Sequence, residues 1–264
     1  MSLVRIGPGE RIKIALRRLL QTVGFEIYRK GKVRELPDVL AHLYSLGLAP
    51  QTVVDVGAAD GTHALYEAFP RARHLLIEPL AEFEPYLEKI TRAYEADYLL
   101  AAAGAAPGTT EITVARSPWC SSTLGLREVD RIDAPPRIVP VVTVDDLCRE
   151  RACRGPFLIK VDVEGGELDV LRGAELTLVE TEVVLLEVSL FEFWPDAPLL
   201  HEVVAFMKER GFVSYDIYGR EVRPLDGALA RMDIAFVKES GRFRRQQVEM
   251  TEEQADRAWR NWGR

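Results

Sequence analysis

Seven short runs rich in valine, isoleucine and leucine recur along the chain, and they limit its fold more than any other feature. They cover residues 52–56, 75–78, 98–102, 157–162, 183–188, 213–218 and 232–237. The apolar residues are largely continuous instead of alternating, which is typical of strands buried on both faces. Amphipathic stretches at 63–69, 82–94, 167–176 and 199–210 lie between most of the runs. The pattern predicts an α/β fold with a seven-stranded, mostly parallel sheet and helices on both of its faces.

One long segment interrupts this rhythm. Residues 109–114 have the pattern of an extra strand, and residues 117–136 that of a long loop. A loop of this length in a compact domain often has a function, such as covering an active site. Trp119, Ser121, Ser122 and Arg127 offer stacking and hydrogen bonding to a polyol. We therefore expect this loop to cover a substrate.

Length and composition predict one main domain with additions. A chain of 264 residues with 47% apolar side chains can bury a sizeable core. We divide it into a basic helical arm over residues 1–49, the main domain over 50–240 and a polar tail or helix over 241–264. No apolar stretch approaches the about 20 residues that a membrane span needs, and the start of the chain is too charged for a secretory signal. A cytoplasmic protein is expected.

The arm differs in charge from the rest of the chain. Residues 1–34 carry nine lysines and arginines against two acids, which gives the arm a charge of +7 and leaves −14 for the remainder. Five apolar residues there share one helical face: Ile12, Leu16, Leu19, Leu20 and Val23. This face can pack on the main domain or on a second subunit of a homo-oligomer, and its basic flanks suit an anionic membrane surface or a phosphate-bearing substrate. Nucleic acid is not an expected partner, because the body of the chain is acidic.

The turn after the first run has the residues of a ligand-binding cradle. The sequence GAADG follows residues 52–56, where Gly57 and Gly61 allow the backbone to approach a ligand and Ala58 adds little bulk. Glu78 ends the second run, 17 residues after Gly61, at a position where a carboxylate accepts hydrogen bonds from two ribose hydroxyls. Both a nicotinamide dinucleotide and S-adenosylmethionine fit this pattern.

Asp55 distinguishes between these two possible cofactors. A dinucleotide brings a pyrophosphate to the start of the first helix, and a carboxylate just before the glycines would oppose it. S-adenosylmethionine carries an ammonium and a sulfonium group and no phosphate, and the turn lacks the GxGxxG spacing. The sequence therefore favours an S-adenosylmethionine-dependent enzyme over a nicotinamide-dependent oxidoreductase. A non-catalytic S-adenosylmethionine-binding partner protein is the third interpretation.

A second group of acids follows the fourth run. The stretch KVDVEGGELDVLRGAEL places Asp162 and Glu164 at the carboxyl end of that strand, and Glu187 ends the next run. Acids so close together repel one another unless a proton, a cation or a ligand compensates. We therefore assign Asp162 and Glu164 to catalysis and Glu187 to substrate binding. The three could also hold a divalent cation, although none is expected.

Seven stretches within roughly residues 50–238 resemble a known protein family. They are VVDVGAADG, LLIEP, PGTTEITV, VTVDDL, LIKVDVEGGELDVLRGAE, VVLLEVS and MDIAFVK. Together these stretches are similar to the FkbM family of S-adenosylmethionine-dependent methyltransferases. The resemblance implies a class I methyltransferase (Rossmann-like) fold, in which the last strand, 232–237, is inserted antiparallel. It also implies O-methylation of a hydroxyl group on a sugar, a glycan or a natural product.

The resemblance also implies roles for the two groups of residues. Those around the cofactor would be Asp55, Gly57, Gly61, Glu78 and Ala102, with Glu78 on the ribose hydroxyls and Ala102 near the adenine. Asp162 and Glu164 would face the methyl group and the acceptor. A sugar hydroxyl attacks weakly unaided, and a carboxylate that accepts its proton contributes roughly 10²–10⁴-fold. Asp162 is the first choice for this base, ahead of His63 and His201.

Overall fold

The structure of the protein, a computed structural model, describes residues 34–115, 121–124, 135–246, 248–252 and 254–255. The amphipathic stretch predicted around residues 12–23, the loop residues Trp119 and Arg127, and the end of the predicted tail lie outside these ranges. Among the helices that the structure describes, each is too short or too polar to cross a lipid bilayer.

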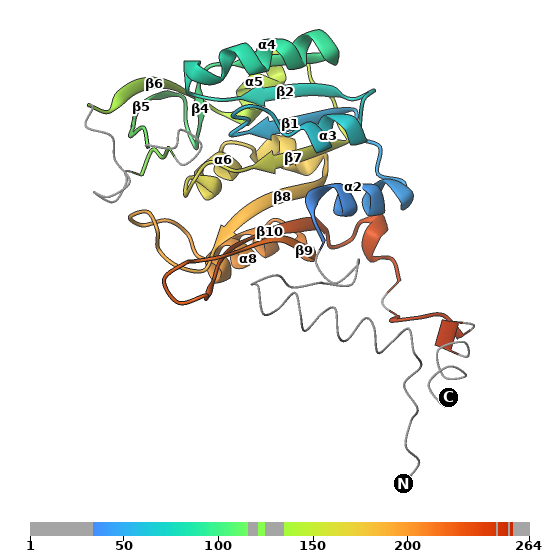
Figure 1. The fold of residues 1–264 in the computed structure, drawn as a ribbon. Helices are drawn as coiled ribbons and strands as arrows, with labels where there is room; N and C mark the ends of the chain where they lie inside the picture. Colours follow the sequence, from blue (N-terminus) through green and yellow to red (C-terminus); the bar gives the residue numbers. More distant parts are fainter. Residues whose placement is uncertain (1–33, 116–120, 125–134, 247, 253, 256–264) are drawn as a thin grey trace, which may run out of the picture. The chain divides into compact units, whose positions relative to one another are not determined.

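A seven-stranded sheet forms the centre of the fold (Figure 1). Its strands lie in the order β3 (Ala96–Leu99), β2 (Arg73–Ile77), β1 (Thr52–Val56), β7 (Phe157–Val161), β8 (Thr181–Ser189), β10 (Leu229–Lys238) and β9 (Phe212–Val222). Neighbouring strands pair in parallel except at β10, which is antiparallel to both β8 and β9. The seven predicted runs overlap these strands, and the implied antiparallel insertion of the last strand is confirmed. The chain has the predicted class I methyltransferase fold.

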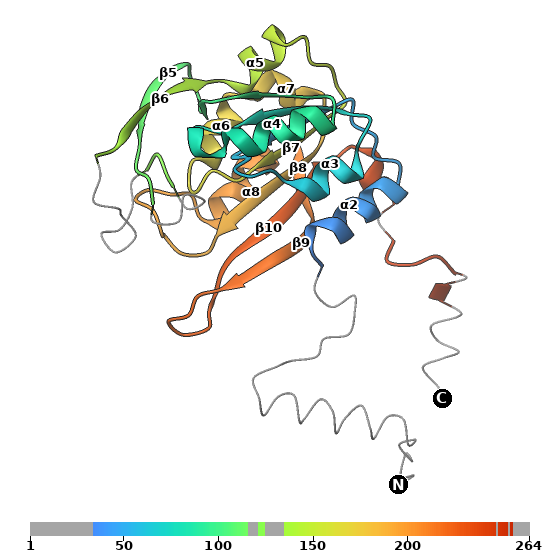
Figure 2. The same cartoon turned by 45° about the horizontal axis from the view of Figure 1, so that its top comes forward.

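Helices cover both faces of the sheet, as predicted (Figures 1 and 2). One face carries α2 (Leu36–Ser45), α3 (His63–Ala68) and α4 (Glu84–Ala93), and the other carries α5 (Val144–Glu150), α6 (Glu167–Arg172), α7 (Glu175–Val179) and α8 (Leu200–Glu209). Successive side chains of a strand point to opposite faces. In β1, Val53 packs in the layer of α2 to α4, whereas Val54 and Val56 pack in the opposite layer. Burial on both faces explains why the strands are continuously apolar.

Helix α2 lies within the residues that the sequence assigns to the basic arm, and it packs on the sheet. Its side chains Val39, Leu40 and Leu43 are fully buried in the core of that layer. The compact unit that contains the sheet begins at Glu35. After β10, the last described strand, follows a 3-10 turn, η4 (Arg242–Arg244).

Two predicted elements are divided in the structure. The predicted strand at 98–102 ends as β3, and the chain then enters a second, three-stranded sheet in the order β4 (Ala102–Ala103), β6 (Arg137–Val142), β5 (Gly108–Ile112). Strand β5 is the extra strand predicted at 109–114. The predicted helix at 167–176 is two helices, α6 and α7, and Gly173 ends the first of them. A Cβ at Gly173 would lie 2.1 Å from the carbonyl oxygen of Gly104, so the backbone next to the small sheet closely approaches the break.

Candidate active site

A cavity opens at the carboxyl ends of β1, β2 and β7, the edge where ligands bind in doubly wound sheets. Counting the open space at its mouth, it encloses about 600 Å³. The residues that line it are Val56, Gly57, Ala59, Ile77, Glu78, Pro79, Leu80, Phe83, Ala101, Ala102, Ala103, Ile112, Ser121, Thr123, Asp162, Val163, Glu164 and Gly166.

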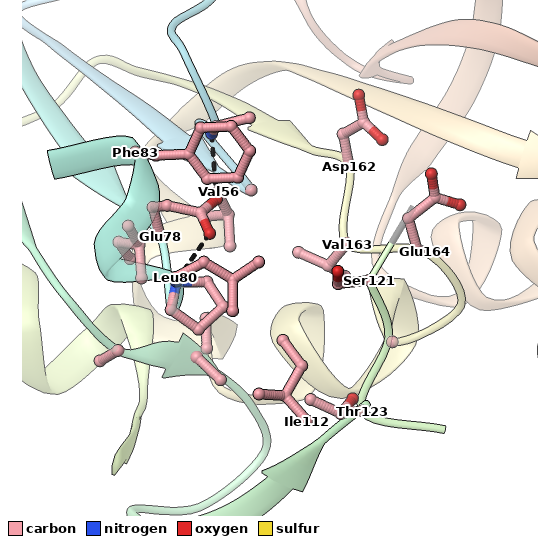
Figure 3. Close-up of a pocket in the computed structure, with 18 residues that line it drawn as sticks. Val56, Glu78, Leu80, Phe83, Ile112, Ser121, Thr123, Asp162, Val163 and Glu164 are labelled. Carbon is pink, nitrogen blue, oxygen red and sulfur yellow. Dashed lines mark hydrogen bonds between the residues drawn. The ribbon is translucent and has the colours of Figure 1, made fainter. Parts of the chain in front are cut away.

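Two walls of different character face each other across this cavity (Figure 3). The Glu78 wall includes Glu78, Leu80 and Phe83, from the end of β2 and the 3-10 turn η1 (Ala81–Phe83). Ala102 and Ile112 of the small sheet are counted with this wall, because they pack with Leu80 and Phe83 in one buried cluster. The carboxylate wall consists of Asp162 and Glu164, which follow β7. The structure therefore brings together, around one cavity, the acids that the sequence predicts at two separate strand ends.

Backbone donors fix Glu78 at the end of β2. Its Oε2 accepts a hydrogen bond from the Ala59 N–H at 3.0 Å, and its Oε1 accepts one from the Leu80 N–H at 2.9 Å. Each carboxylate oxygen can accept a second hydrogen bond, so two ligand hydroxyls can bind here. Glu78 is 5% exposed, and burial raises its pKa to about 7.

The rest of the Glu78 wall is apolar. Leu80, Phe83, Ala102 and Ile112 pack in one buried cluster that joins η1 to the small sheet. Apolar surface suits an aromatic ring, and the buried carboxylate beside it suits hydroxyl groups. This wall therefore fits a nucleoside.

Close packing explains the glycines of the first turn. Gly57 has a φ of +76°, and a Cβ there would lie 1.8 Å from the carbonyl oxygen of Asp162, so the turn after β1 touches the turn after β7. Gly61 has a φ of +103°, and a Cβ there would lie 2.4 Å from a side-chain carbon of α4. Of the predicted turn residues, Gly57 lines the cavity, whereas Ala58 and Gly61 are outside its lining. Ala59, which sequence analysis did not assign to the site, lines it and donates to Glu78.

Asp55 lies in a buried network beside the cavity. It is 1% exposed, and its carboxylate accepts hydrogen bonds from the Tyr66 hydroxyl at 2.5 Å and the Thr62 hydroxyl at 3.2 Å. The Lys160 Nζ lies 3.8 Å from its Oδ1. Asp55 is outside the lining of the cavity, and its place beside the cofactor stays a prediction.

The two acids of the carboxylate wall have different surroundings. The Asp162 side chain is 36% exposed, and its Oδ2 lies 3.0 Å from the Lys160 Nζ. The Glu164 side chain is 9% exposed, and its Oε2 lies 3.1 Å from the Arg231 Nη1. Burial raises the pKa of Glu164 to about 8, against the opposing effect of Arg231. The backbone of Glu164 has a φ of +56°, and its carbonyl oxygen accepts a hydrogen bond from the buried Ser122 hydroxyl at 2.7 Å.

Arg231 joins this wall although sequence analysis did not identify it. It lies near the start of β10, and the antiparallel register of β10 and β8 brings it close to Glu187. Its Nη1 lies 3.6 Å from Oε2 of Glu187 as well as 3.1 Å from Oε2 of Glu164. The sequence signal that marks it is a basic residue directly before the apolar run of β10. Only the pairing of strands shows which acids it meets.

Glu187 lies next to the carboxylate wall, outside the lining of the cavity. Burial raises its pKa to about 9, and the neighbouring Asp162 and Glu164 add to the shift. One carboxylate oxygen from each of Asp162, Glu164 and Glu187 lies within 4.8 Å of the others. Three such oxygens suit a divalent cation, but Arg231 already supplies a positive charge to two of these acids.

The described part of the predicted covering loop reaches the cavity. Ser121 and Thr123 line it, whereas Ser122 is fully buried and supports the turn beneath. Both histidines considered as alternative bases, His63 and His201, are exposed and outside the lining. The geometry therefore leaves the acids as the groups that can take up a proton in the described part of the cavity.

The solved structures that this chain resembles include methyltransferases, at low sequence identity. They include cofactor-bound Rv0187 from MTB, at 13% identity over 90% of this chain and 93% of that chain with a TM-score of 0.44. Magnesium protoporphyrin IX methyltransferase from Synechocystis PCC 6803 with bound SAM has 10% identity over 90% and 86%, with a TM-score of 0.42. Precorrin-6y C5,15-methyltransferase from Geobacter metallireducens GS-15 has 13% identity over 80% and 92%, with a TM-score of 0.40.

Family membership comes from the sequence. No curated protein matches the chain. The methyltransferase FkbM domain matches residues 55–214, which is more than half of the chain and includes the Glu78 wall, the carboxylate wall and the strands that carry them. The chain therefore belongs to the FkbM methyltransferase family, and it is an S-adenosylmethionine-dependent methyltransferase.

Proposed function

We propose that the protein transfers the methyl group of S-adenosylmethionine to a hydroxyl oxygen of a sugar, a glycan or a hydroxylated natural product in the cytosol. The observation that carries the proposal is the Asp162 carboxylate, which lines the cavity opposite Glu78 and is 36% exposed (Figure 3). A hydroxyl loses its proton as its oxygen attacks, so this reaction is accelerated by a proton acceptor beside it. Asp162 is better suited to that role than Glu164, whose side chain is 9% exposed and paired with Arg231.

The Glu78 wall is suited to the nucleoside half of the cofactor. Glu78 would accept hydrogen bonds from the ribose hydroxyls, and Leu80, Phe83, Ala102 and Ile112 would contact the adenine. S-adenosylmethionine, when bound, supplies a methyl group on a positively charged sulfur. The two walls then have separate tasks, since one binds the cofactor and the other binds the acceptor.

The carboxylate wall is suited to an acceptor with several hydroxyl groups. Carboxyl oxygens accept hydrogen bonds, and Asp162 and Glu164 present theirs next to each other. Neighbouring hydroxyls of a polyol supply donors at a similar spacing. Ser121 and Thr123 lie on the same cavity and can donate or accept further hydrogen bonds. An acceptor held in this way keeps one oxygen aligned with the methyl group, which is the main requirement of an in-line displacement.

The test is a product survey by mass spectrometry. The protein is incubated with S-adenosylmethionine and a panel of sugars, glycans and hydroxylated natural products, with and without a chelator. We expect at least one acceptor to gain a single methyl group, located on oxygen by NMR of the product. A methyl group on nitrogen or carbon would contradict the proposal. Tight cofactor binding without transfer to any compound would favour the non-catalytic binding protein.

A further inference from the structure

A buried lysine links the carboxylate wall to the first turn. Lys160 lies on β7, and its side chain is 13% exposed. Its Nζ lies 3.0 Å from Oδ2 of Asp162 and 3.8 Å from Oδ1 of Asp55. Asp55 on β1 is the register partner of Lys160, and Asp162 follows two residues later, so the three side chains lie on one face of the sheet. The lysine therefore bridges two carboxylates that the sequence places more than 100 residues apart.

We propose that Lys160 is a positioning residue that holds the Asp162 carboxylate at the acceptor side of the cavity and is itself held by the buried carboxylate of Asp55. The inference rests on the proposed function, in which Asp162 accepts the hydroxyl proton. It gives Asp55 an indirect role, through Lys160, that differs from contact with the cofactor.

Asp55 is a fixed anchor for the lysine. It is 1% exposed, and the hydroxyls of Tyr66 and Thr62 already donate to it. A carboxylate buried this deeply requires a compensating charge, and the Lys160 ammonium is the cation beside it in the described structure. Burial opposes the charge of Lys160, but Asp162 and Asp55 outweigh burial and raise the pKa of the lysine above its ordinary value. An ammonium has three donors, so it can bind both carboxylates at once.

The titratable groups that interact with Asp162 are mostly acids. They come from neighbouring elements: Glu164 and Glu167 after β7, Glu187 on β8, Asp233 on β10 and the phenol of Tyr218 on β9. Burial raises the pKa of each of these four carboxyl groups to about 7 to 9, and Arg231 is engaged by Glu164 and Glu187. Lys160 is therefore the ion-pair partner of Asp162 in the described structure. Its loss would remove the opposite charge that favours the ionised form of Asp162, and a protonated acid cannot accept the hydroxyl proton.

The first measurement needs no methyl acceptor. Protein labelled with ¹³C at the aspartate carboxyl carbons is titrated by NMR with S-adenosylhomocysteine bound, and the Asp162 signal is the one lost in Asp162→Asn. In Lys160→Met we expect the titration midpoint of the Asp162 signal to move to higher pH. In Lys160→Arg we expect this midpoint to stay near that of the wild type. Lys208→Met is the matched control, because Lys208, on α8, forms an exposed ion pair with Glu239. An unchanged midpoint in Lys160→Met would overturn the proposal, and Lys160→Gln replaces this variant if it fails to fold.

The second measurement uses the acceptor found in the product survey. Lys160→Met should lower kcat by about 10-fold and move the acidic limb of the kcat profile to higher pH, while the Kd of S-adenosylmethionine changes by less than about 3-fold. In the Asp162→Asn background, Lys160→Met should have no further effect on kcat. Additive losses would mean that Lys160 acts independently of Asp162. A normal kcat in Asp162→Asn with a shifted NMR midpoint in Lys160→Met would refute Asp162 as the base, and leave Lys160 as its positioning residue.

Discussion

The two walls of the cavity hold their acids in different ways. Glu78 is fixed by the backbone N–H groups of Leu80, two residues after it, and of Ala59 in the turn after β1, beside the apolar side chains of its wall. Asp162 and Glu164 are held by side-chain cations, Lys160 and Arg231, and the second of these comes from a strand 67 residues away. A carboxylate held by the backbone keeps one geometry, which suits the binding of a cofactor. The Asp162 carboxylate is paired with Lys160 through Oδ2, and its side chain is 36% exposed, which suits the transfer of a proton.

The same comparison explains the protonation of the site. Burial raises the pKa of Glu78 to about 7 against its two backbone donors, and the neighbouring Asp55 and Glu82 add to the shift. Burial raises the pKa of Glu187 to about 9, and the neighbouring Asp162 and Glu164 add to the shift. The acids of the carboxylate wall and Glu187 therefore interact with one another and with Arg231, whereas Glu78 interacts with backbone donors and with acids outside that cluster. Substitutions in the two walls should change different measured quantities.

The largest effect is expected at Asp162. Asp162→Asn keeps the shape and removes the basic oxygen, so kcat should fall by about 10²-fold or more while the Kd of S-adenosylmethionine stays within about 2-fold. Steady-state kinetics and calorimetry measure the two quantities separately. Asp169→Asn on α6 is the control, because its side chain is 56% exposed and outside the cavity. A loss of cofactor binding in Asp162→Asn would place this acid with the cofactor and break the division between the walls.

A smaller effect, on binding alone, is expected at Glu78. Glu78→Ala removes an ionised acceptor for two hydroxyls, which should weaken S-adenosylmethionine binding by about 1.5–3 kcal/mol. The value of kcat at saturating cofactor should change little. Glu78→Gln keeps one carbonyl oxygen and should lose less affinity than the alanine variant. The exposed Glu88→Ala on α4 is the control, and unchanged affinity by calorimetry in Glu78→Ala would remove this residue from the cofactor site.

The smallest effect concerns stability and pH. The folded pKa of Glu187, about 9, is above its ordinary value of 4.5, so the folded protein retains a proton that the unfolded chain releases. This stabilisation is complete below pH 4.5 and is lost as the pH rises to about 9. Between pH 6 and 8 the free energy of unfolding should therefore fall less steeply with pH in Glu187→Gln than in the wild type. The two slopes should differ by at most about 1.4 kcal/mol per pH unit. Urea unfolding measures this slope, and the exposed Glu209→Gln should leave it unchanged.

The sequence was sufficient for the elements that have a strong local signal. Continuous apolar runs marked the strands of the main sheet, because strands buried on both faces have no polar face. Strand β6 and helix α5 were not predicted: half of the residues of β6 are exposed, and Pro140 interrupts its apolar run. At the break between α6 and α7, the backbone of Gly173 lies close to the carbonyl oxygen of Gly104, which is distant in the chain. A local sequence pattern does not predict such a contact.

The same distinction applies to the site. The pattern of apolar runs predicts that Glu78 and Asp162 stand at the ends of parallel strands, and such ends meet at one edge of a sheet whatever the details of packing. The packing of distant segments places Asp55 beside Lys160, Ser122 against the Glu164 carbonyl and Arg231 between Glu164 and Glu187, and no local pattern predicts these contacts. The physical reason is that the position of a carboxylate follows from the strand that carries it. Its partner and its protonation follow from side chains that other strands bring within 4 Å.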